Sequence, residues 1–314
     1  MSYNNLITRN QNFILDSKIL YINSDDRNIQ KYPNANSFEI NMPQAYKNVE
    51  SIRLLNIQFP SNLYNISEEL QNNKFRLTIG STDSIINISD GYYTIDKLIT
   101  EIKNNITGFD ISYNNTTNKF NLSADTDCSL SFHDISYINC NSHSKYVYEQ
   151  HSKWGLGYIL GFNKYEKVDN IFDYRNPRIV NIKNGGVSSD NFVDIDNNRN
   201  IVMSIDKYNK ADSILPYINK TNNNSNVGLV NSVFVKIPII KNEYNQNFHN
   251  FESNYSNMSF FQPPITSLEK LKFEFKYDND ILVDFNNYNI TFTLEINQIS
   301  NQIKKYEVRK PFVN

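Results

Sequence analysis

Short segments in which apolar and polar residues alternate recur along this 314-residue chain, and they constrain its fold more than any other feature. A period of two places every second side chain on the same face of a β-strand, so each segment predicts a strand with one buried face. The clearest case is residues 271–277, Leu-Lys-Phe-Glu-Phe-Lys-Tyr. The other predicted strands are residues 18–22, 37–42, 49–59, 75–79, 109–113, 119–122, 200–205, 232–238, 282–285 and 290–296.

One segment has helical periodicity instead. Its apolar residues, Ile95, Leu98, Ile99 and Ile102, recur at the spacing that lines one face of a helix, and Thr94 stands in the N-cap position. Two alternating segments follow, separated by the turn-forming residues 114–118, and they predict a hairpin. We therefore expect a small lobe made of one helix and one hairpin.

Composition supports a protein dominated by sheets. Aromatic residues make up 13% of the chain, with 21 Tyr and 20 Phe, and such side chains fit pleated, half-buried surfaces. The later strands, from residue 200 onwards, have no predicted helices between them, which argues against a parallel βαβ sheet. Asn is abundant, in runs such as residues 222–224, and we attribute this to AT-rich codons rather than to a structural role.

Charge and cysteine content exclude several classes of protein. With 31 basic and 33 acidic residues the net charge is −2, so the chain has no overall field for gripping nucleic acid or an anionic membrane. Cys128 and Cys140 are too few for a disulfide scaffold and match no zinc spacing. No apolar stretch approaches 18 residues, and residues 1–11 do not resemble a signal peptide. We expect a soluble, intracellular chain with reduced thiols.

These observations predict an all-β fold, a jelly-roll-type antiparallel β-sandwich with a small helix-plus-hairpin insertion. The predicted organisation has three parts. Residues 1–17 form an N-terminal arm, residues 18–90 and 150–314 form the jelly-roll core, and residues 91–149 form the insertion lobe.

Residue types that carry chemistry do not occur in a recognisable pattern. His133, Cys140, His143 and His151 are spaced unlike any metal-binding helix or knuckle, and they offer no pattern for a Cys–His nucleophile. His249 lies alone in a loop rich in Tyr and Asn. Solvated loop residues are the preferred interpretation of all five.

Phosphate and calcium motifs are also incomplete. Gly155, Gly157 and Gly161 are only a fragment of a dinucleotide-binding pattern, and residues 154–162 are better interpreted as a buried turn. The acidic residues between Asp190 and Asp196 lack the spacing of a calcium loop, so a solvated loop is preferred. We therefore predict no catalytic, cofactor-binding or metal-binding residues, and no cofactor.

Three parts of the sequence resemble a known family. Residues 32–40 (YPNANSFEI), 46–54 (YKNVESIRL) and Phe59-Pro60 resemble the N-terminal part of penton and minor capsid proteins of the nucleocytoplasmic large DNA viruses. Residues 90–94 (DGYYT), which lead into the helix, share the resemblance. The C-terminal segments 261–264, 271–275, 283–285 and 292–296 are similar to that group's closing strands. The match covers both ends, about half the chain, and leaves residues 125–250 unanchored; Asp280-Ile281 departs from the group's usual glycine.

The resemblance implies a jelly-roll capsid subunit of the virion, assembled in the host cytoplasm. As a penton it would form a homopentamer at the vertices, in contact with the major capsid protein and other minor capsid proteins and without binding nucleic acid. In such a ring each interface joins two different patches. The insertion lobe would project outward, unless it is found packed beneath the shell.

Other functions stay open at this point. A minor, cementing capsid protein fits the same resemblance. A glycan-binding module on the virion would depend on exposed Tyr or on Trp154, although Tyr and Phe more often form sheet faces and subunit contacts. A glycoside hydrolase with a β-sandwich fold is a third class, for which no pair of carboxylates stands out.

Overall fold

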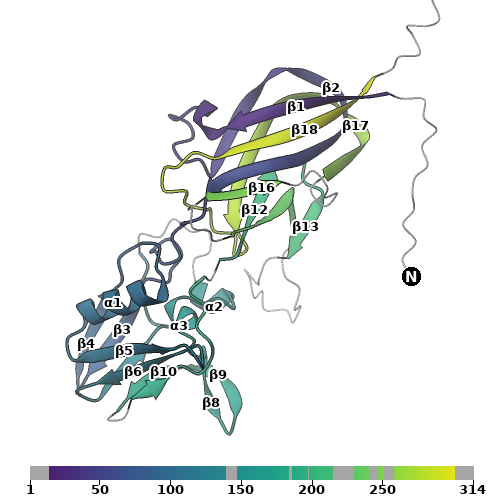
Figure 1. The fold of residues 1–314 in the computed structure, drawn as a ribbon. Coiled ribbons are helices and arrows are strands. Elements are labelled where there is room, and N and C mark those ends of the chain that lie inside the picture. Colours follow the sequence, from purple (N-terminus) through teal and green to yellow (C-terminus); the bar gives the residue numbers. More distant parts are fainter. Residues whose placement is uncertain are drawn as a thin grey trace, which may run out of the picture.

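The strands form two bodies, which lie one above the other in Figure 1. The structure is a computed structural model that describes residues 14–138, 147–183, 186–196, 198–214, 230–240, 246–250 and 258–300. The upper body is built from both ends of the described chain, and the lower body from its middle. All strand pairs that the structure describes are antiparallel, which confirms the predicted all-β, antiparallel class.

A seven-stranded sheet makes up most of the upper body. Its strands run in the order β1-β18-β2-β17-β12-β15, and β16 also pairs with β2. Their bounds are β1 (Ile14–Asn23), β2 (Ser37–Pro60), β12 (Asn200–Ile205), β15 (Val235–Pro238), β16 (Gln246–Asn250), β17 (Met258–Tyr277) and β18 (Thr291–Ser300). A short 3-10 turn, η1 (Ser24–Asp26), follows β1, and β13 (Ala211–Ile214) pairs with β14 (Val230–Val233) beside the sheet.

Two long strands, β2 and β17, divide this sheet into two layers because each of them runs through both. The second half of β2, from Val49, pairs with β18 and with β16, whereas its first half pairs with the second half of β17. One layer is therefore β1, β18, late β2 and β16 with early β17; the other is early β2, late β17, β12 and β15. Strands that pass from one layer to the other in this order give the predicted jelly roll.

The junctions between the layers are marked by residues that interrupt pairing. Asn48 adopts φ 53° where β2 changes layer. The register between β2 and β17 shifts twice, and Pro43 and the pair Pro263-Pro264 lie within the two shifts. Proline has no backbone N–H to donate, so a strand tolerates it where the ladder is already broken. Sequence reasoning predicted two separate strands, 37–42 and 49–59; the structure joins them into one that ends at Pro60, as expected.

The two layers enclose one apolar core. Inward side chains of late β2 and β18 meet those of early β2, late β17 and β12. The largest fully buried residues include Phe38, Phe59, Phe273, Phe275 and Phe292, and the rings of Phe273 and Phe292 meet edge-on at 4.9 Å between centroids. Burial of so many aromatic rings explains the high Phe content of the chain.

The lower body lies between the end of β2 and the start of β12. One sheet has the order β10-β7-β3-β4, made of β3 (Lys74–Ile79), β4 (Thr82–Asn87), β7 (Cys128–Ser131) and β10 (Ile179–Ile182). A second sheet has the order β11-β6-β5, made of β5 (Phe109–Asn114), β6 (Lys119–Ala124) and β11 (Val187–Ser188). The helices are α1 (Ile95–Asn105), α2 (Val147–Gln150) and α3 (Leu156–Ile159), and β8 (Tyr165–Val168) with β9 (Ile171–Pro177) forms a projecting hairpin.

A second apolar cluster holds the lower body together. It includes Leu98 and Ile102 of α1, Phe75 and Leu77 of β3, and Trp154. Its members run from Ile66 to Val193 and Ile195, so the residues packed around α1 extend well beyond the predicted insertion lobe at 91–149. Residues from the ranges 66–90 and 150–195 therefore share an apolar core with the helix, although they lie outside the predicted lobe.

Individual elements follow the sequence predictions to different degrees. The helix is confirmed, and Thr94 caps it by accepting a hydrogen bond from the Lys97 amide at 3.4 Å. The hairpin that follows is confirmed as β5 and β6. The predicted strand 282–285 is wrong, because only an isolated bridge between Leu282 and Lys276 forms there. The predicted strand 232–238 is split into β14 and β15.

Candidate functional site

The outward face of the layer β1–β18–β2 is a candidate contact surface. Matched rows cross it, such as Ile19, Glu295 and Arg53, because the strand registers place these residues side by side. We call it the outer sheet face, and define it by Leu15, Ser17, Ile19, Tyr21, Ser51, Arg53, Asn56, Gln58, Phe248, Met258, Phe260, Thr291, Thr293, Glu295, Asn297 and Ile299.

The centre of the outer sheet face is polar, but its polar groups bond to one another. Arg53 Nη2 lies 2.7 Å from Glu295 Oε2, and the two side chains are only 18% and 17% exposed. The Asn297 amide donates to Ser51 Oγ at 3.1 Å, and the Ser17 hydroxyl bonds to both Glu295 and Asn297. The two charged residues that define this face therefore neutralise each other.

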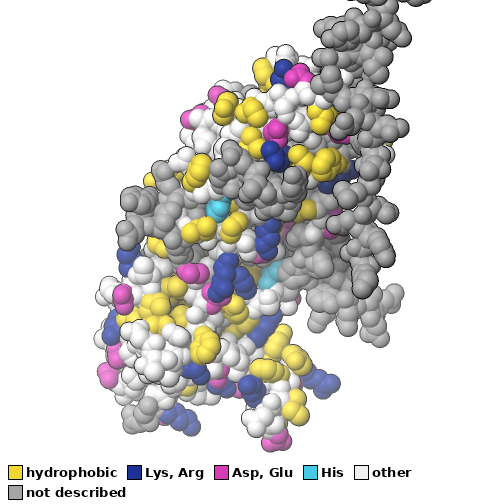
Figure 2. All heavy atoms as spheres, turned by 45° about the vertical axis from the view of Figure 1, so that its right-hand side comes forward, with side chains coloured by type: hydrophobic (Ala, Val, Ile, Leu, Met, Phe, Trp, Pro, Cys, Tyr) yellow, Lys and Arg dark blue, Asp and Glu magenta, His cyan; other side chains and the backbone are white. Residues whose placement is uncertain are grey.

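Apolar side chains flank this polar centre. Leu15, Ile19 and Tyr21 are exposed on β1, where Tyr21 is 79% exposed, and Phe248 and Phe260 are exposed at the opposite side of the layer. Figure 2 shows hydrophobic side chains gathered around a pair of basic and acidic ones on the upper body. Exposed apolar and aromatic groups around paired charges are typical of a protein–protein contact surface.

The hairpin β8–β9 is a second candidate surface. Its two turn residues, Asp169 and Asn170, have φ angles of 51° and 65°, which are the left-handed conformations required by a tight two-residue hairpin turn. Apolar side chains surround this tip: Val168, Ile171, Phe172 and Tyr174 are all exposed. They form the separate hydrophobic group that projects from the lower body in Figure 2.

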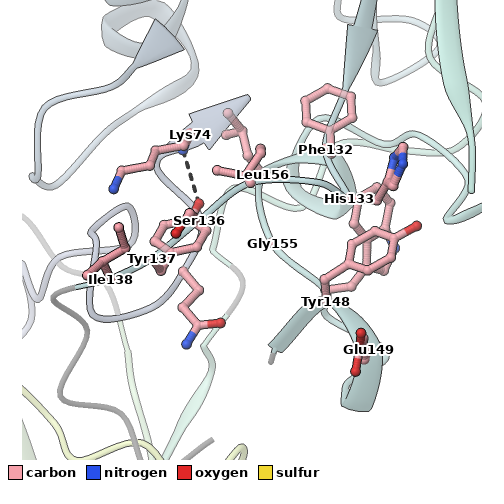
Figure 3. A pocket seen from close by; sticks show the side chains of 13 residues that line it. Lys74, Phe132, His133, Ser136, Tyr137, Ile138, Tyr148, Glu149, Gly155 and Leu156 are labelled. Carbon is pink, nitrogen blue, oxygen red and sulfur yellow. Dashed lines mark hydrogen bonds between the residues drawn. The ribbon is translucent and has the colours of Figure 1, made fainter. Parts of the chain in front are cut away.

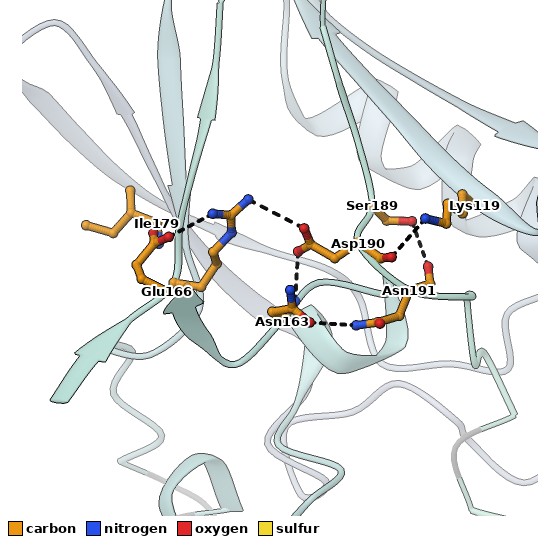
Figure 4. Close-up of polar contacts among 8 residues, drawn as sticks. Lys119, Asn163, Glu166, Ile179, Ser189, Asp190 and Asn191 are labelled. Atoms are coloured by element: carbon orange, nitrogen blue, oxygen red, sulfur yellow. Dashed lines mark hydrogen bonds and ion pairs between the residues drawn. The ribbon is translucent and has the colours of Figure 1, made fainter. Parts of the chain in front are cut away.

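Ion pairs and hydrogen bonds fix the base of the hairpin (Figure 4). Arg178 Nη1 lies 2.7 Å from Glu166 Oε2, and its Nη2 lies 3.6 Å from Asp190 Oδ1. The Asp190 carboxylate also accepts from the backbone N–H of Asn163 at 3.0 Å, and the backbone carbonyl of Asp190 accepts from Lys119 Nζ at 2.8 Å. The hairpin thus leaves the lower body from a fixed base, which holds its apolar tip in position.

A hollow of about 370 Å³ lies near this base (Figure 3). His133 and Tyr148 face each other on one side, with ring centroids 6.1 Å apart, and Lys74 and Tyr137 lie on the other. The Tyr137 hydroxyl accepts from the Lys74 amide at 3.2 Å. Burial raises the pKa of Tyr148, whose hydroxyl donates to the Lys164 carbonyl at 2.9 Å. The lining therefore mixes aromatic, aliphatic and polar side chains.

Where the structure describes them, the histidines and cysteines considered from sequence do not assemble into a metal-binding group. His133 lies 2.8 Å from the Ser131 hydroxyl. The prediction of solvated residues is wrong for His151, which is buried near α2, and for His249, which is buried against Phe59. Cys128 is buried in β7. Cys140 and His143 lie outside the described residues. Within the part of the chain that the structure describes, no group of three His, Cys, Asp or Glu could hold a metal ion.

Glycines of the segment 154–162 have structural roles. A Cβ on Gly157 would lie 2.0 Å from Trp154 Cη2, so the indole packs directly against this backbone. Gly161, at φ 84°, lies against the Asn191 carbonyl. Trp154 is only 5% exposed. The predicted buried turn is confirmed, with the short helix α3 inside it, and the suggestion of Trp154 as an exposed platform for glycans is wrong.

The acidic residues 190–196 are spread among separate partners. Asp190 belongs to the hairpin base, and Asp194 pairs with Arg199 at 3.1 Å and accepts from the Tyr158 hydroxyl at 3.1 Å. These carboxylates connect separate loops and do not form one cluster. Among the helices that the structure describes, none has the length and apolar character needed to cross a membrane.

The fold defines a jelly-roll protein with a second, smaller body and two candidate contact surfaces. A family described as a family of unknown function (DUF5901) matches residues 8–132. No curated protein sequence matches the chain.

Two similar solved structures come from virophages. The mavirus penton protein has 12% sequence identity and a TM-score of 0.43, over 92% of this chain and 99% of that chain. A chain of the Sputnik virophage has 10% identity and a TM-score of 0.38, over 93% and 99%.

Proposed function

We propose that this chain is a structural subunit of a viral capsid, a penton protein that forms a five-membered ring at the vertices of a large DNA virus. The observation that carries the proposal is the outer sheet face, in which buried, mutually bonded polar groups are flanked by exposed apolar side chains. A surface of this kind matches the centre of a protein–protein contact, where unpaired charge is depleted and aromatic residues are enriched.

The sequence resemblance to capsid proteins supports the same function. Its segments map onto the jelly roll: residues 37–40 begin β2, residues 46–54 span the point where β2 changes layer, and residues 261–264 and 271–275 belong to β17. These are the strands that pass between the layers. The resemblance therefore concerns the residues that determine the fold of such a subunit.

We further propose that residues 61–199, rather than 91–149, form the inserted unit. The chain leaves the jelly roll at Pro60 and returns at Asn200, and the second apolar cluster lies between these points. In the assembled virion this unit would project outward, while the jelly roll contacts its copies, the major capsid protein and the minor capsid proteins.

Negative-stain imaging of the purified protein tests this function. A five-membered ring is expected, in which each outer sheet face meets a different patch of its neighbour, because cyclic interfaces are heterologous. A monomer that joins capsids only between other subunits would instead favour a minor, cementing role. Rings of another order would contradict the penton assignment.

A further inference from the structure

The outer sheet face ends on both sides in a strand edge. Its layer consists of β1, β18, the second half of β2, and then β16 followed by the start of β17 (Figure 1). In the part of the chain that the structure describes, β1 pairs only with β18, and β16 pairs only with β2. We call the first edge the β1 margin, with Leu15, Ser17, Ile19 and Tyr21, and the second the β16 margin, with Phe248, Met258 and Phe260.

Backbone groups of both margins point away from the sheet. Antiparallel strands bond through every second residue pair. The Ser24 N–H donates to the Ile290 carbonyl at 2.9 Å, and these two residues continue the register of β1 and β18. The even residues of β1 therefore bond to β18, and the odd residues of the β1 margin turn their N–H and carbonyl groups to the edge. The same alternation, followed across β18 and β2, turns the backbone of Phe248 and Phe260 to the opposite edge.

The side chains at the two margins are mostly apolar and exposed. Ile19 and Tyr21 are exposed on β1, and Phe248 and Phe260 are 64% and 59% exposed on the other side. The β1 edge is also long: β1 has ten residues without a register shift, whereas the other strands that end the three larger described sheets have two to six. A long apolar edge without a proline or a bulge is a template for pairing with another strand.

The strand directions allow one copy of the chain to extend the sheet of the next. Each of β1, β18, β2 and β16 runs antiparallel to the strand beside it, so β1 and β16 run in opposite directions. A copy that is rotated about an axis along the strands keeps its strand directions, and its β16 would run antiparallel to β1. Each copy then uses one margin of each kind, which is the heterologous contact that a closed ring requires.

We propose that the β1 margin of each copy pairs with the β16 margin of the next copy, so that the outer layers form one hydrogen-bonded sheet around the ring. Backbone donors and acceptors at the two edges then bond to each other, and Ile19 and Tyr21 of one copy lie beside Phe248 of the next as cross-strand apolar neighbours. The number of copies rests on the proposed function, whereas the pairing of the margins does not.

Cysteine cross-linking of the full chain tests the pairing. Facing residues of an antiparallel ladder lie about 5.5 Å apart between Cα atoms, which a disulfide can span. Phe248→Cys is combined in turn with Leu15→Cys, Ile19→Cys and Tyr21→Cys, and oxidation is followed by non-reducing electrophoresis. We expect at least one double variant to give a ladder of linked chains that ends at five.

Two controls accompany the double variants. The wild type reports any linkage through its own cysteines, Cys128 and Cys140. The variant Phe248→Cys/Tyr174→Cys carries its second cysteine on the β8–β9 hairpin, at a position as exposed as those on β1. Neither control should form the ladder, because neither places two cysteines on facing margins.

A backbone substitution separates edge pairing from a contact made only by side chains. Ile19→Pro removes an N–H that points to the edge and leaves the bonds to β18 in place, as an edge strand tolerates. Ile19→Ala loses the same side chain but keeps the N–H. We expect Ile19→Pro to abolish assembly in sedimentation velocity and Ile19→Ala to retain it, with circular dichroism as the check on folding. Equal assembly of the two variants would overturn the pairing.

Failure of the pairing and failure of the proposed function give different results. Five-chain rings with no cross-link from any of the three double variants would overturn the pairing and leave the penton assignment standing. A ladder that ends at another number of chains would support the pairing and contradict the penton assignment. A protein that stays monomeric and unlinked, or a Tyr174→Cys control that links as well as the double variants, would overturn the pairing.

Discussion

Arg53 and Glu295 lie opposite each other on β2 and β18, and their ion pair, 2.7 Å long, is shielded by exposed apolar neighbours on the outer sheet face. The pair leaves this face without net charge. The ion pair lies near the centre of the surface that we propose for subunit contacts.

The substitution Glu295→Gln should destabilise the monomer by about 1–2 kcal/mol, because it leaves a partly buried guanidinium without its carboxylate. Urea unfolding measures the change. Glu269→Gln is a matched control at an exposed carboxylate on β17, expected to stay within about 0.5 kcal/mol of the wild type. Equal effects of both substitutions would show that the pair contributes nothing beyond an ordinary surface charge.

The substitution Gly157→Ala should destabilise the lower body by about 3 kcal/mol, because the new methyl group would overlap the Trp154 ring and crowd Phe132. Trp154 fluorescence during urea unfolding reports the loss. Gly80→Ala is the comparison: no atom lies within 4 Å of its Cβ position, and only its φ of 60° opposes alanine, at about 1 kcal/mol. A smaller effect at Gly157 than at Gly80 would refute the packing described here.

Loss of the Thr94 cap should cost about 1 kcal/mol. Thr94→Ala removes the oxygen that accepts from the Lys97 amide, whereas Thr94→Ser keeps it. The expected order of thermal stability is wild type and Thr94→Ser together, with Thr94→Ala below them. A Thr94→Ser protein as unstable as Thr94→Ala would mean that the methyl group, not the hydroxyl, matters.

Stability should fall in mild acid because of two buried histidines. Burial lowers the pKa of His151, with Lys164 lowering it further and Asp280 opposing the shift, and burial also lowers the pKa of His249. Below pH 6.5, the ordinary pKa of histidine, the unfolded chain binds protons that the folded chain does not bind. The two neutral, buried histidines therefore contribute stability above pH 6.5, and this contribution is lost as the pH falls below that value.

Urea unfolding between pH 5 and pH 7.5, roughly the range where a histidine titrates, checks this expectation. The variants His151→Asn and His249→Asn should each show a flatter dependence of the unfolding free energy on pH than the wild type. Their absolute stability also changes through packing, so the slope is the quantity to compare. Slopes parallel to that of the wild type would show that neither histidine is responsible.

Much of the jelly roll follows from alternation in the sequence. The pattern at 271–277 predicts the end of β17 because one face of this strand is buried, whereas the apolar run at 201–203 predicts β12, which is buried on both faces. Alternation does not show that β17 begins at Met258, since Pro263 and Pro264 interrupt the pattern. Only the three-dimensional pairing reveals that these prolines lie where the register shifts.

The lower body and the hairpin were harder to predict. The strand β4 carries almost no buried side chain, so it has no apolar period to detect. The turn of β8–β9 uses Asp169 and Asn170 instead of a glycine, and the residues on either side of it, Val168 and Ile171, are exposed. The pair Asp-Asn between Val168 and Ile171 was the available signal. The contact of Lys164 with the Tyr148 ring joins two residues whose spacing in the sequence follows no strand or helix period, so the sequence does not predict it.

Sedimentation velocity on the wild type and on the double variant Ile19→Asp/Tyr21→Asp tests most directly whether the outer sheet face joins copies of the chain. We predict a wild-type species of five chains, each of 36.7 kDa, and a folded monomer for the variant, because two carboxylates on that face cannot be desolvated without partners. A wild type that stays monomeric at every concentration, or a variant that still assembles like the wild type, would contradict the account.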